Sequence, residues 1–386
     1  MQHDSFNKVK LIFLRILTFF YGNGGTMAIK YKWLAEKLRE KIKHNIENGI
    51  NKLPTEEELS KKYRVSRQTV RQALALLQES GLVEKRKGSG TYITGLLPEE
   101  NNQVALLINT DREYIYPALI DDIKKILFTH GYEVSVFQTH NHTFTEREIL
   151  EYLLEAPPRG IIVEGCKSAL PNMNIDLYNQ LQFSNSKLVF LHNSYKALPN
   201  ATVVKDDNYG GAYSLVKHFY ELGHRNIGGI FFADDLQGVE RYQGFLEGMR
   251  DYKLAVRDEQ IAWFHTIQYQ QLQQRQSTEF LRDILDQLLK SCSAILIYND
   301  ELAYWLIKEL YQNYPGFFDE VALASFDNTY LSNTNYLKLT TLAHKPHEMG
   351  TRVAQIMIDK LKGLPVHSQE VPWELHLGES SRKRDS

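Results

Sequence analysis

One predicted helix near the start of the chain opens with side chains that can read the edges of DNA bases. Ser66 precedes this helix, and its first turns carry Arg67, Gln68, Thr69 and Arg71. An arginine guanidinium matches the O6 and N7 acceptors of guanine, whereas glutamine and threonine can bond adenine edges or phosphates. These residue types at the start of a helix therefore suit contact with the major groove of DNA.

Three helices are predicted around these residues. The first covers residues 31–48, and its apolar residues recur every four positions as Leu34, Leu38, Ile42 and Ile46. The second begins after Thr55, because Thr55 and Glu58 have the spacing of a capping box. The third begins after Ser66 and ends at Gly81, the residue type that favours a helix C-terminus. Two helices joined by a tight turn, the second bearing arginines, predict a helix–turn–helix.

A basic hairpin is predicted after the third helix. Short strands over residues 82–84 and 92–94 flank a glycine-rich tip that holds Lys87 and Gly88. Such a hairpin forms a wing whose basic side chains can contact phosphates or the minor groove. Lys30, at the predicted start of the first helix, is a further candidate for phosphate contact.

The charge of the chain is divided unevenly. Residues 27–95 hold 15 Lys and Arg against 8 Asp and Glu, whereas the whole chain of 386 residues has a net charge of −2. The part after residue 95 is therefore acidic. A basic segment joined to an acidic one indicates a polyanionic partner, such as DNA, for the basic segment.

Length and composition indicate a multidomain globular protein. A chain of 386 residues exceeds one ordinary core, so two or three domains are expected. With 43% hydrophobic and 24% charged residues, the composition excludes a disordered or membrane chain. Cys166 and Cys292 each adjoin an apolar run, and we interpret them as core residues in a reducing compartment. Neither a CxxC nor an HExxH zinc spacing is present in the sequence.

A leader and two domains joined by a linker are expected. Residues 11–21 are apolar but too short to span a bilayer, which needs about 20 residues. We expect residues 1–26 to be a leader that is non-native or disordered. Residues 27–95 then form a winged helix–turn–helix domain, residues 96–103 a linker, and residues 104–386 a two-lobed domain that also mediates dimerisation.

Beyond the linker the sequence alternates between apolar strands and amphipathic helices. Strands are predicted at residues 104–109, 134–138, 160–164 and 187–192 and, after residues 206–207, at 226–232, 260–265, 294–298 and 321–325. This alternation is typical of mainly parallel sheets covered by helices. Two successive sets of elements indicate two lobes, each with a Rossmann-like parallel sheet.

Polar residues follow several of these predicted strands. Arg241, Asn299 and Asp327 stand in three such positions. Ligands of parallel sheets bind at the carboxyl ends of the strands. A guanidinium, an amide and a carboxylate together supply the donors and acceptors that hydroxyl groups need. In a purely structural alternative, Asn299 caps the helix that follows it and Arg241 lies on an exposed helix face.

The basic segment resembles the winged helix–turn–helix of GntR-type bacterial regulators. The resemblance rests on the motifs LPTE, VSRQTVRQAL, GLV and GSGTY, in that order. It implies that Thr55, Arg67, Arg71 and Gly88 contact operator DNA. The chain departs from the family before Lys52, where the family has a few more residues and a proline–glycine turn. We therefore expect a DNA-binding surface formed by Lys30, Thr55, Glu56, Ser66, Arg67, Gln68, Thr69, Arg71, Lys87 and Gly88.

Residues 104–380 resemble the sugar-sensing domain of LacI/GalR-type repressors, which is related to periplasmic sugar-binding proteins. The resemblance rests on RYQGF from Arg241, NDELA from Asn299 and ASFDN around Asp327, the last of which departs from the usual V-G-x-D-D. His344 follows a predicted crossing between the lobes and either closes over the ligand or is a structural hinge residue. The resemblance implies a ligand site formed by Tyr116, Glu164, Lys167, Asp207, Gln237, Arg241, Asn299, Asp327 and His344.

A GntR-type winged helix–turn–helix domain joined to a LacI-type sugar-sensing domain resembles the arabinose-responsive repressors of Gram-positive bacteria. The resemblance implies a cytoplasmic homodimer that leaves operator DNA when a sugar, L-arabinose, binds. A different sugar or a sugar phosphate is the alternative effector. The resemblance implies no cofactor, metal or membrane partner. A sugar-modifying enzyme and a secreted binding protein are rival classes. The sequence lacks a Walker A loop, a G-x-S-x-G motif and a G-x-G-x-x-G after a strand, and the basic segment argues against export.

Overall fold

The computed structural model describes most of the chain in two compact units. The described residues are 25–86, 88–95, 101–111, 114–318, 320–333 and 337–381. One unit comprises the residues up to Asn101 together with Tyr178–Ser186, and the second contains the rest. In the part of the chain that the structure describes, no helix is long and apolar enough to cross a membrane.

Some of the sequence-based predictions fall on residues that the structure does not describe. Residues 1–24, residues 96–100 and Lys87 lie outside the described residues. The predicted leader and the predicted domain boundaries therefore remain predictions.

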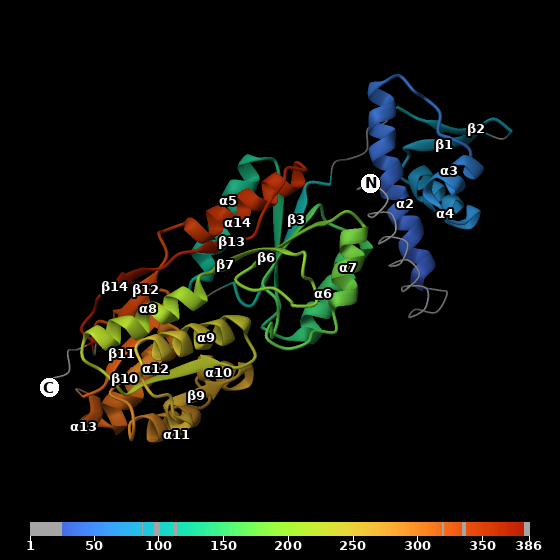
Figure 1. The fold of residues 1–386 in the computed structure, drawn as a ribbon. Coiled ribbons are helices and arrows are strands. Elements are labelled where there is room, and N and C mark those ends of the chain that lie inside the picture. The colour runs from blue at the N-terminus through green and yellow to red at the C-terminus, as the bar shows by residue number, and fades with distance from the viewer. Residues whose placement is uncertain are drawn as a thin grey trace. The chain divides into compact units, whose positions relative to one another are not determined.

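The winged domain, residues 25–95, combines helices with one hairpin (Figure 1, blue). In chain order its elements are α2 (Gly25–Glu47), α3 (Glu56–Tyr63), α4 (Arg67–Glu79), β1 (Val83–Arg86) and β2 (Gly90–Ile93). The strands β1 and β2 pair antiparallel. One core joins the helices, in which Leu38, Leu59 and Leu77 have no exposed surface. The predicted winged helix–turn–helix is confirmed.

Side-chain caps begin α3 and α4. The Thr55 hydroxyl accepts a hydrogen bond from the Glu58 N–H at 3.3 Å, and the Glu58 carboxylate accepts one from the Thr55 N–H at 2.7 Å. These two bonds form the predicted capping box. The Ser66 hydroxyl accepts from the Thr69 N–H at 3.1 Å, so the predicted cap of α4 is also confirmed.

Two details of the winged domain differ from the prediction. Helix α2 begins at Gly25, upstream of the expected start, because no proline or strong cap interrupts the residues that precede Tyr31. Lys30 therefore lies within α2 and not at its first turn. The hairpin strands are longer than expected, since their antiparallel pairing continues until Arg86 lies opposite Gly90.

The first lobe of the two-lobed domain is a parallel sheet with helices around it (Figure 1). Its elements are β3 (Gln103–Ile108), α5 (Tyr116–Thr129), β4 (Glu133–Gln138), α6 (Thr143–Glu155), β5 (Gly160–Val163), α7 (Ile175–Phe183), β6 (Lys187–Leu191) and β7 (Thr202–Asp206), followed near the C-terminus by α14 (Glu348–Leu361) and β13 (Gln369–Val371). The strand order is β13-β7-β6-β5-β3-β4, and neighbouring strands are parallel.

The second lobe repeats this plan. Its elements are α8 (Asn208–Glu221), β8 (Ile227–Phe232), α9 (Leu236–Asp251), η1 (Asp258–Gln260), β9 (Ile261–Phe264), α10 (Thr266–Gln273), α11 (Glu279–Leu288), β10 (Ala294–Ile297), α12 (Asp300–Asn313), α13 (Pro315–Phe318), β11 (Ala322–Phe326), η2 (Tyr330–Ser332), β12 (Thr340–Ala343) and β14 (Glu374–His376). The strand order is β14-β12-β11-β10-β8-β9, with only the β12–β14 pair antiparallel among the described strands. The predicted two-lobed fold with parallel sheets is confirmed.

Helices cover both faces of the second-lobe sheet. Phe231 of β8 packs in a cluster with α8 and α9, whereas Phe232 packs on the opposite face with α10, α11 and α12. Successive strand residues point to opposite faces, so a continuous apolar strand such as β8 supplies both cores. In the first lobe, α5 and α14 together cover one face of the sheet.

The chain passes between the lobes three times within the described residues. The first crossing follows Asp206 at the end of β7, the second follows Ala343 at the end of β12, and residues 372–373 form the third. The sequence indicated the first two crossings. It did not indicate the elements α14 and β13 or the third crossing that follows them.

Close packing of α8 against α9 explains the glycine of the RYQGF motif. A Cβ atom added to Gly244 would lie 2.0 Å from the backbone oxygen of Tyr209 in α8. The absence of a side chain therefore lets the two helices approach each other. This approach places Arg241 of α9 beside Asn208 of α8, with 2.9 Å between Nε and Oδ1.

The substitution Gly244→Ala should destabilise the two-lobed domain. Because the added methyl group meets fixed backbone, we expect the free energy of unfolding to fall by about 1–3 kcal/mol in urea titrations followed by circular dichroism. Gly316→Ala is the matched control, since a Cβ there meets nothing within 4 Å. Equal effects of the two substitutions would contradict the packing argument.

Candidate functional site

The first turns of α4 expose most of the side chains predicted to read bases. Arg67, Gln68 and Arg71 are exposed. Thr69 differs, because it is only 2% exposed and its hydroxyl lies 2.8 Å from the Ser66 hydroxyl. Thr69 therefore takes part in the N-terminal cap of α4. Its side chain was predicted to contact DNA, but it does not belong to the exposed surface.

Glutamates of α3 pair with the arginines of α4. Arg67 lies 3.0 Å from Glu57, and Glu56 bridges Arg71 at 2.8 Å and Lys85 of the wing at 2.7 Å. Hydrogen bonds from Lys85 and Arg71 lower the pKa of Glu56, so this side chain is a carboxylate at neutral pH. A carboxylate repels phosphate. Glu56, which was predicted to contact DNA, joins α4 to the wing in this structure.

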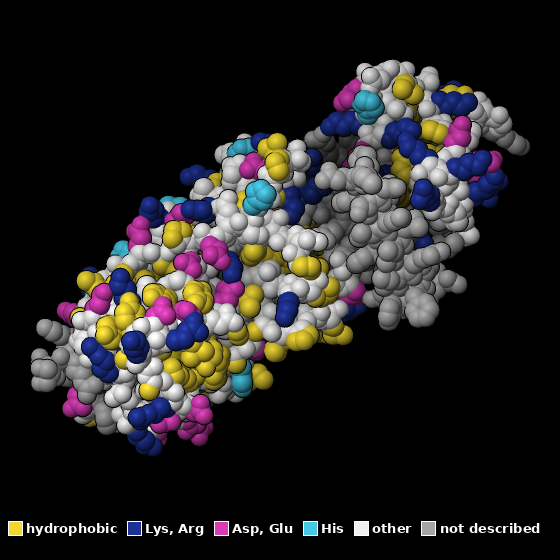
Figure 2. All heavy atoms as spheres, viewed as in Figure 1, with side chains coloured by type: hydrophobic (Ala, Val, Ile, Leu, Met, Phe, Trp, Pro, Cys, Tyr) yellow, Lys and Arg dark blue, Asp and Glu magenta, His cyan; other side chains and the backbone are white. Residues whose placement is uncertain are grey.

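The remaining predicted DNA contacts lie at the edges of this surface. Thr55 is exposed and bonded to Glu58, Lys30 is half-buried in α2, and Gly88 has the positive φ of 74° that a tight hairpin tip requires. Lys and Arg side chains gather on the winged domain in Figure 2. Basic side chains that are more than half exposed include Lys61, Arg67, Arg71, Lys85 and Arg86.

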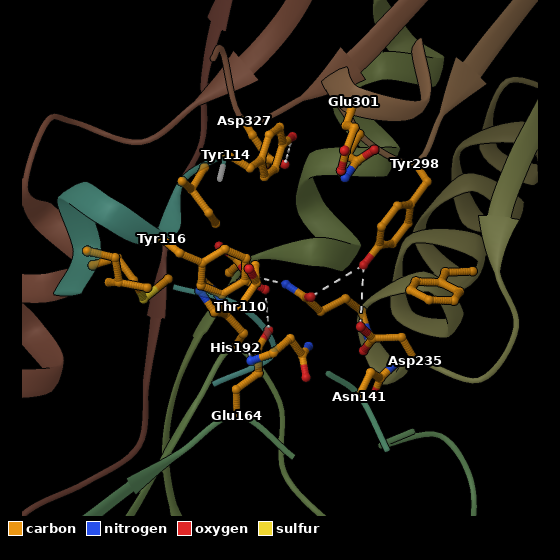
Figure 3. Close-up of a pocket in the computed structure, with 18 of the residues that line it drawn as sticks. Thr110, Tyr114, Tyr116, Asn141, Glu164, His192, Asp235, Tyr298, Glu301 and Asp327 are labelled. Atoms are coloured by element: carbon orange, nitrogen blue, oxygen red, sulfur yellow. Dashed lines mark hydrogen bonds and ion pairs between the residues drawn. The ribbon is translucent and has the colours of Figure 1, made fainter. Parts of the chain in front are cut away.

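A cavity of about 890 Å³ lies between the two lobes. Several of its residues stand at the carboxyl ends of strands, where parallel sheets place ligands. Glu164 follows β5, Asn299 follows β10 and Asp327 follows β11. Figure 3 shows Glu164 of the first lobe and Asp327 of the second among the side chains that line the cavity. Most of the residues predicted to bind the effector line the cavity, namely Tyr116, Glu164, Gln237, Arg241, Asn299, Asp327 and His344.

Lys167 and Asp207 are the predicted effector contacts that the structure does not place in the lining. Asp207 caps α8, its carboxylate accepting the Gly210 N–H at 2.8 Å. Lys167 has a left-handed backbone with φ of 44°, and its N–H donates to Asn141 at 2.7 Å. The neighbour of Asp207, Asp206, lines the cavity instead, because adjacent side chains at a strand end point in opposite directions.

Arg241 is enclosed by the protein and only 2% exposed. Its Nε donates to Asn208 at 2.9 Å, its Nη1 donates to the Tyr298 carbonyl, and its guanidinium lies 3.9 Å from the centre of the Phe326 ring. Oxygen acceptors and aromatic faces thus replace the water that a cation loses on burial. The alternative that Arg241 lies on an exposed helix face is wrong.

Asn299 caps a helix and also lines the cavity. Its Oδ1 accepts the Leu302 N–H at 2.9 Å and caps α12. Its Nδ2 donates to the Tyr269 hydroxyl at 2.9 Å, and both side chains line the cavity. The Tyr269 hydroxyl in turn donates to Glu301. The cap fixes the rotamer of Asn299, so its amide nitrogen faces the polar lining.

Buried carboxylates with tyrosine donors line the cavity from both lobes. The Tyr116 hydroxyl donates to Glu164 at 3.0 Å, and the Tyr114 hydroxyl donates to Asp327 across the cleft. Burial raises the pKa of Glu164, Asp327 and Asp235. Tyr114 was not predicted, although it stands two residues before Tyr116 in the same loop.

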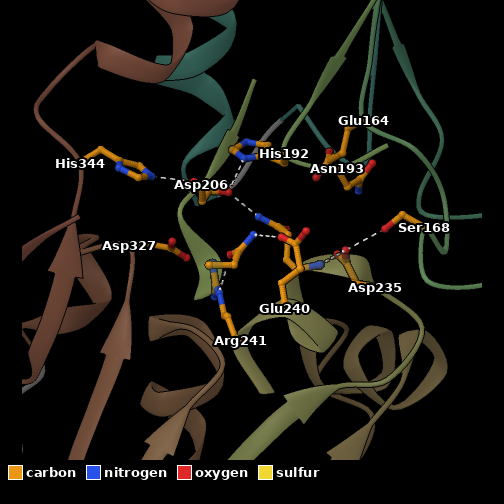
Figure 4. A network of polar contacts seen from close by, with 12 residues as sticks. Glu164, Ser168, His192, Asn193, Asp206, Asp235, Glu240, Arg241, Asp327 and His344 are labelled. Atoms are coloured by element: carbon orange, nitrogen blue, oxygen red, sulfur yellow. Dashed lines mark hydrogen bonds and ion pairs between the residues drawn. The ribbon is translucent and has the colours of Figure 1, made fainter. Parts of the chain in front are cut away.

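Sequence reasoning also missed Asp206 and His192, which form a polar network with His344 and Gln237 (Figure 4). Asp206 is 3% exposed and accepts from His192 at 3.0 Å, His344 at 2.6 Å and Gln237 at 2.6 Å. Burial opposes charge on both partners, but the attraction between them holds the pKa of Asp206 well below its usual value and raises that of His192 to about 9. Both residues lie at strand ends, and this position is the sequence feature from which they could have been identified.

This lining suits a ligand rich in hydroxyl groups. Amide, imidazole, carboxylate and hydroxyl groups supply donors and acceptors at fixed positions, and Phe232, Tyr269 and Tyr298 supply ring faces for C–H surfaces. Among the residues that the structure describes, no group of three or more His, Cys, Asp or Glu side chains could hold a metal ion.

Comparison with known proteins identifies the same two parts. Residues 30–93 match the family model for bacterial regulatory proteins of the gntR family, and residues 216–381 match the model for a periplasmic binding protein-like domain. The chain is 33% identical over 339 residues to the arabinose metabolism transcriptional repressor of Halalkalibacterium halodurans, covering 86% of this chain and 89% of the relative. It is 30% identical over 336 residues to the arabinose metabolism transcriptional repressor of Geobacillus stearothermophilus, covering 86% and 91%.

A solved structure supports the fold of the two lobes. The periplasmic binding protein/LacI transcriptional regulator of Alkaliphilus metalliredigens, complexed with D-xylulofuranose, has a TM-score of 0.60 at 22% identity, covering 72% of this chain and 99% of that one. The family itself follows from the two repressors that are similar along most of the chain. The chain therefore belongs to the family of bacterial regulators that join a gntR-type DNA-binding domain to a periplasmic binding protein-like effector domain.

Proposed function

We propose that this chain is a transcriptional repressor that leaves its operator when a neutral sugar, L-arabinose, binds between the lobes. The observation that carries the proposal is the cavity in which Arg241, Asn299 and Asp327 meet. Similarity to two arabinose metabolism transcriptional repressors supports the choice of sugar. Because the partner of the winged domain is operator DNA, the protein works in the cytoplasm.

The charges of the cavity favour a neutral sugar over a sugar phosphate. The carboxylates that line it are Asp122, Glu164, Asp206, Asp235, Glu301, Asp327 and Glu348. The cationic groups are already engaged. Arg241 bonds Asn208 and a backbone carbonyl, His192 and His344 both bond Asp206, and Lys345 is 69% exposed and paired with Glu374. A phosphate group with a charge of about −2 would face this acidic lining and be repelled.

Hydrogen bonds across the cleft connect sugar binding with lobe movement. Asn141 of the first lobe donates to Thr266 of the second at 2.9 Å, and Ser168 donates to Asp235 at 3.0 Å. A sugar that bonds both lobes favours the arrangement in which these contacts form, by its difference in affinity for the two states. Two copies of the chain would place two winged domains on a two-fold operator, and lobe closure would change their spacing.

Titration of the protein with a panel of sugars tests the ligand and the class of activity together. Isothermal titration should detect binding of L-arabinose but not of arabinose 5-phosphate, because the lining is acidic. Chromatography of the mixture should recover the sugar unchanged, since the relatives are regulators. Formation of a product would overturn the proposal in favour of an enzyme.

Replacement of a base-reading arginine should weaken operator binding. Arg67→Ala is expected to cost about 1–3 kcal/mol of specific binding in a gel-shift titration, because a bidentate contact with guanine is lost. Lys37→Ala is the control in the same domain, since Lys37 lies on α2 and pairs with Glu40. Equal loss of affinity for operator and scrambled DNA would mean that Arg67 only contacts phosphate.

Arg241→Ala should separate the two activities of the protein. We expect operator binding to persist while sugar affinity falls by about 2–3 kcal/mol, because a charged donor leaves the cavity. Arg225→Ala is the matched control, since the Arg225 guanidinium also stacks on a ring, 4.0 Å from Tyr220, but lies outside the cavity. If the Arg241 variant still releases DNA at the wild-type sugar concentration, the assignment of the cavity is wrong.

A further inference from the structure

We infer that Asp206 and His344 form a hinge lock, a hydrogen-bonded pair that joins the three crossings between the lobes and orients Gln237 toward the ligand. Asp206 and His344 would thus act as positioning residues for sugar binding, and the lock would hold only while His344 is an imidazolium. This inference rests on the proposed sugar-binding function.

The imidazole of His344 touches all three crossings. His344 itself opens the second crossing. Its Nε2 donates at 2.6 Å to Asp206, where the first crossing begins, and its Nδ1 donates at 2.9 Å to the Pro372 carbonyl of the third. Trp373 stacks on the ring with 3.7 Å between the ring centres and 17° between the planes. One side chain therefore links the segments that must move when the lobes rotate.

Both ring nitrogens of His344 face oxygen atoms that can only accept hydrogen bonds. A backbone carbonyl has no proton to give, and Asp206 is ionised because its histidine partners hold its pKa well below the usual value. The ring must therefore carry a hydrogen on each nitrogen, as an imidazolium does. A neutral His344 would keep only one of the two bonds, and one crossing would lose its link.

Asp206 also determines how Gln237 presents its amide to the cavity. The Gln237 Nε2 donates to Asp206 at 2.6 Å. Because a carboxylate cannot donate, the amide oxygen must point the other way, where the Tyr298 hydroxyl lies at 3.4 Å. Gln237 and Tyr298 both line the cavity. The lock thus selects an acceptor, and not a donor, at this position of the binding surface.

The charged and titratable groups around His344 lie on several elements. Asp206 of β7 and Asp327 after β11 act on His344 directly. His192 after β6 and Arg241 of α9 act on these two carboxylates, and Lys345, next to His344 in the chain, pairs with Glu374 of β14. Burial alone would lower the pKa of His344, but the hydrogen bond and charge of Asp206 raise it above its usual value. A raised pKa means that the lock is complete below the ordinary histidine pKa and is lost as pH rises through the raised value. His192, with a pKa of about 9, changes in the same direction.

Calorimetric titration of the full chain with L-arabinose between about pH 6.5 and about pH 9.5 tests the lock. Wild-type affinity should fall by about tenfold or more toward the alkaline end, because one charge-assisted hydrogen bond is lost. His344→Gln should show about a tenfold weaker affinity at neutral pH and a flatter pH profile, since glutamine does not titrate. Hydrogen-exchange protection of residues 206–207, 343–345 and 372–374 should fall in the variant and, at high pH, in the wild type.

His224→Gln is the matched control. His224 is a buried histidine of the second lobe that bonds the Ser293 hydroxyl at 3.0 Å and lies outside the cavity. The control should keep the wild-type affinity and pH profile. The same profile in the His344 variant would overturn the hinge lock. If His344→Gln does not fold, unchanged protection of the wild-type crossings across the pH range would overturn it equally. Absence of sugar binding by the wild type would contradict the proposed function, while the protection measured without sugar still decides the lock.

Discussion

Charges that leave water need replacement partners, and this requirement organises the space between the lobes. An ion moved into a protein interior costs several kcal/mol unless hydrogen bonds and opposite charges compensate it. Asp206 meets the requirement with donors from His192 in the first lobe and Gln237 in the second. Arg241 meets it with Asn208 and a carbonyl. Because the partners of Asp206 lie in both lobes, satisfying its charge also fixes how the lobes face each other.

Features that depend on residues close in sequence could be predicted. The caps at Thr55 and Ser66 involve side chains and N–H groups three residues apart, so their geometry follows from local spacing. The start of α2 was missed because a helix extends upstream wherever no residue stops it. The orientation of Thr69 was missed because it depends on which face of α4 the winged core buries.

Features that depend on how distant segments of the chain come together could be predicted only in part. The rule that ligands gather at strand ends located Arg241, Asn299 and Asp327, all of which line the cavity. The same rule did not distinguish Asp206 from Asp207, since a shift of one residue reverses the direction of a side chain. The sequence indicated a crossing near His344, but not the helix α14, the strand β13 or the crossing after them. The third crossing and its contact with His344 could therefore not be predicted.

In the absence of DNA, glutamates of α3 form ion pairs with arginines of α4. In the proposed complex with operator DNA, a duplex would exchange an intramolecular carboxylate for a phosphate or a base at Arg67 and at Arg71. Each such exchange releases fewer counterions than contact with an unpaired cation, so general attraction to any duplex is weakened. Base recognition suffers less, because guanine offers an arginine two matched acceptors. In that complex, Glu56 and Glu57 would compete with the DNA phosphates for the two arginines. This competition would favour rapid dissociation from sequences that do not match.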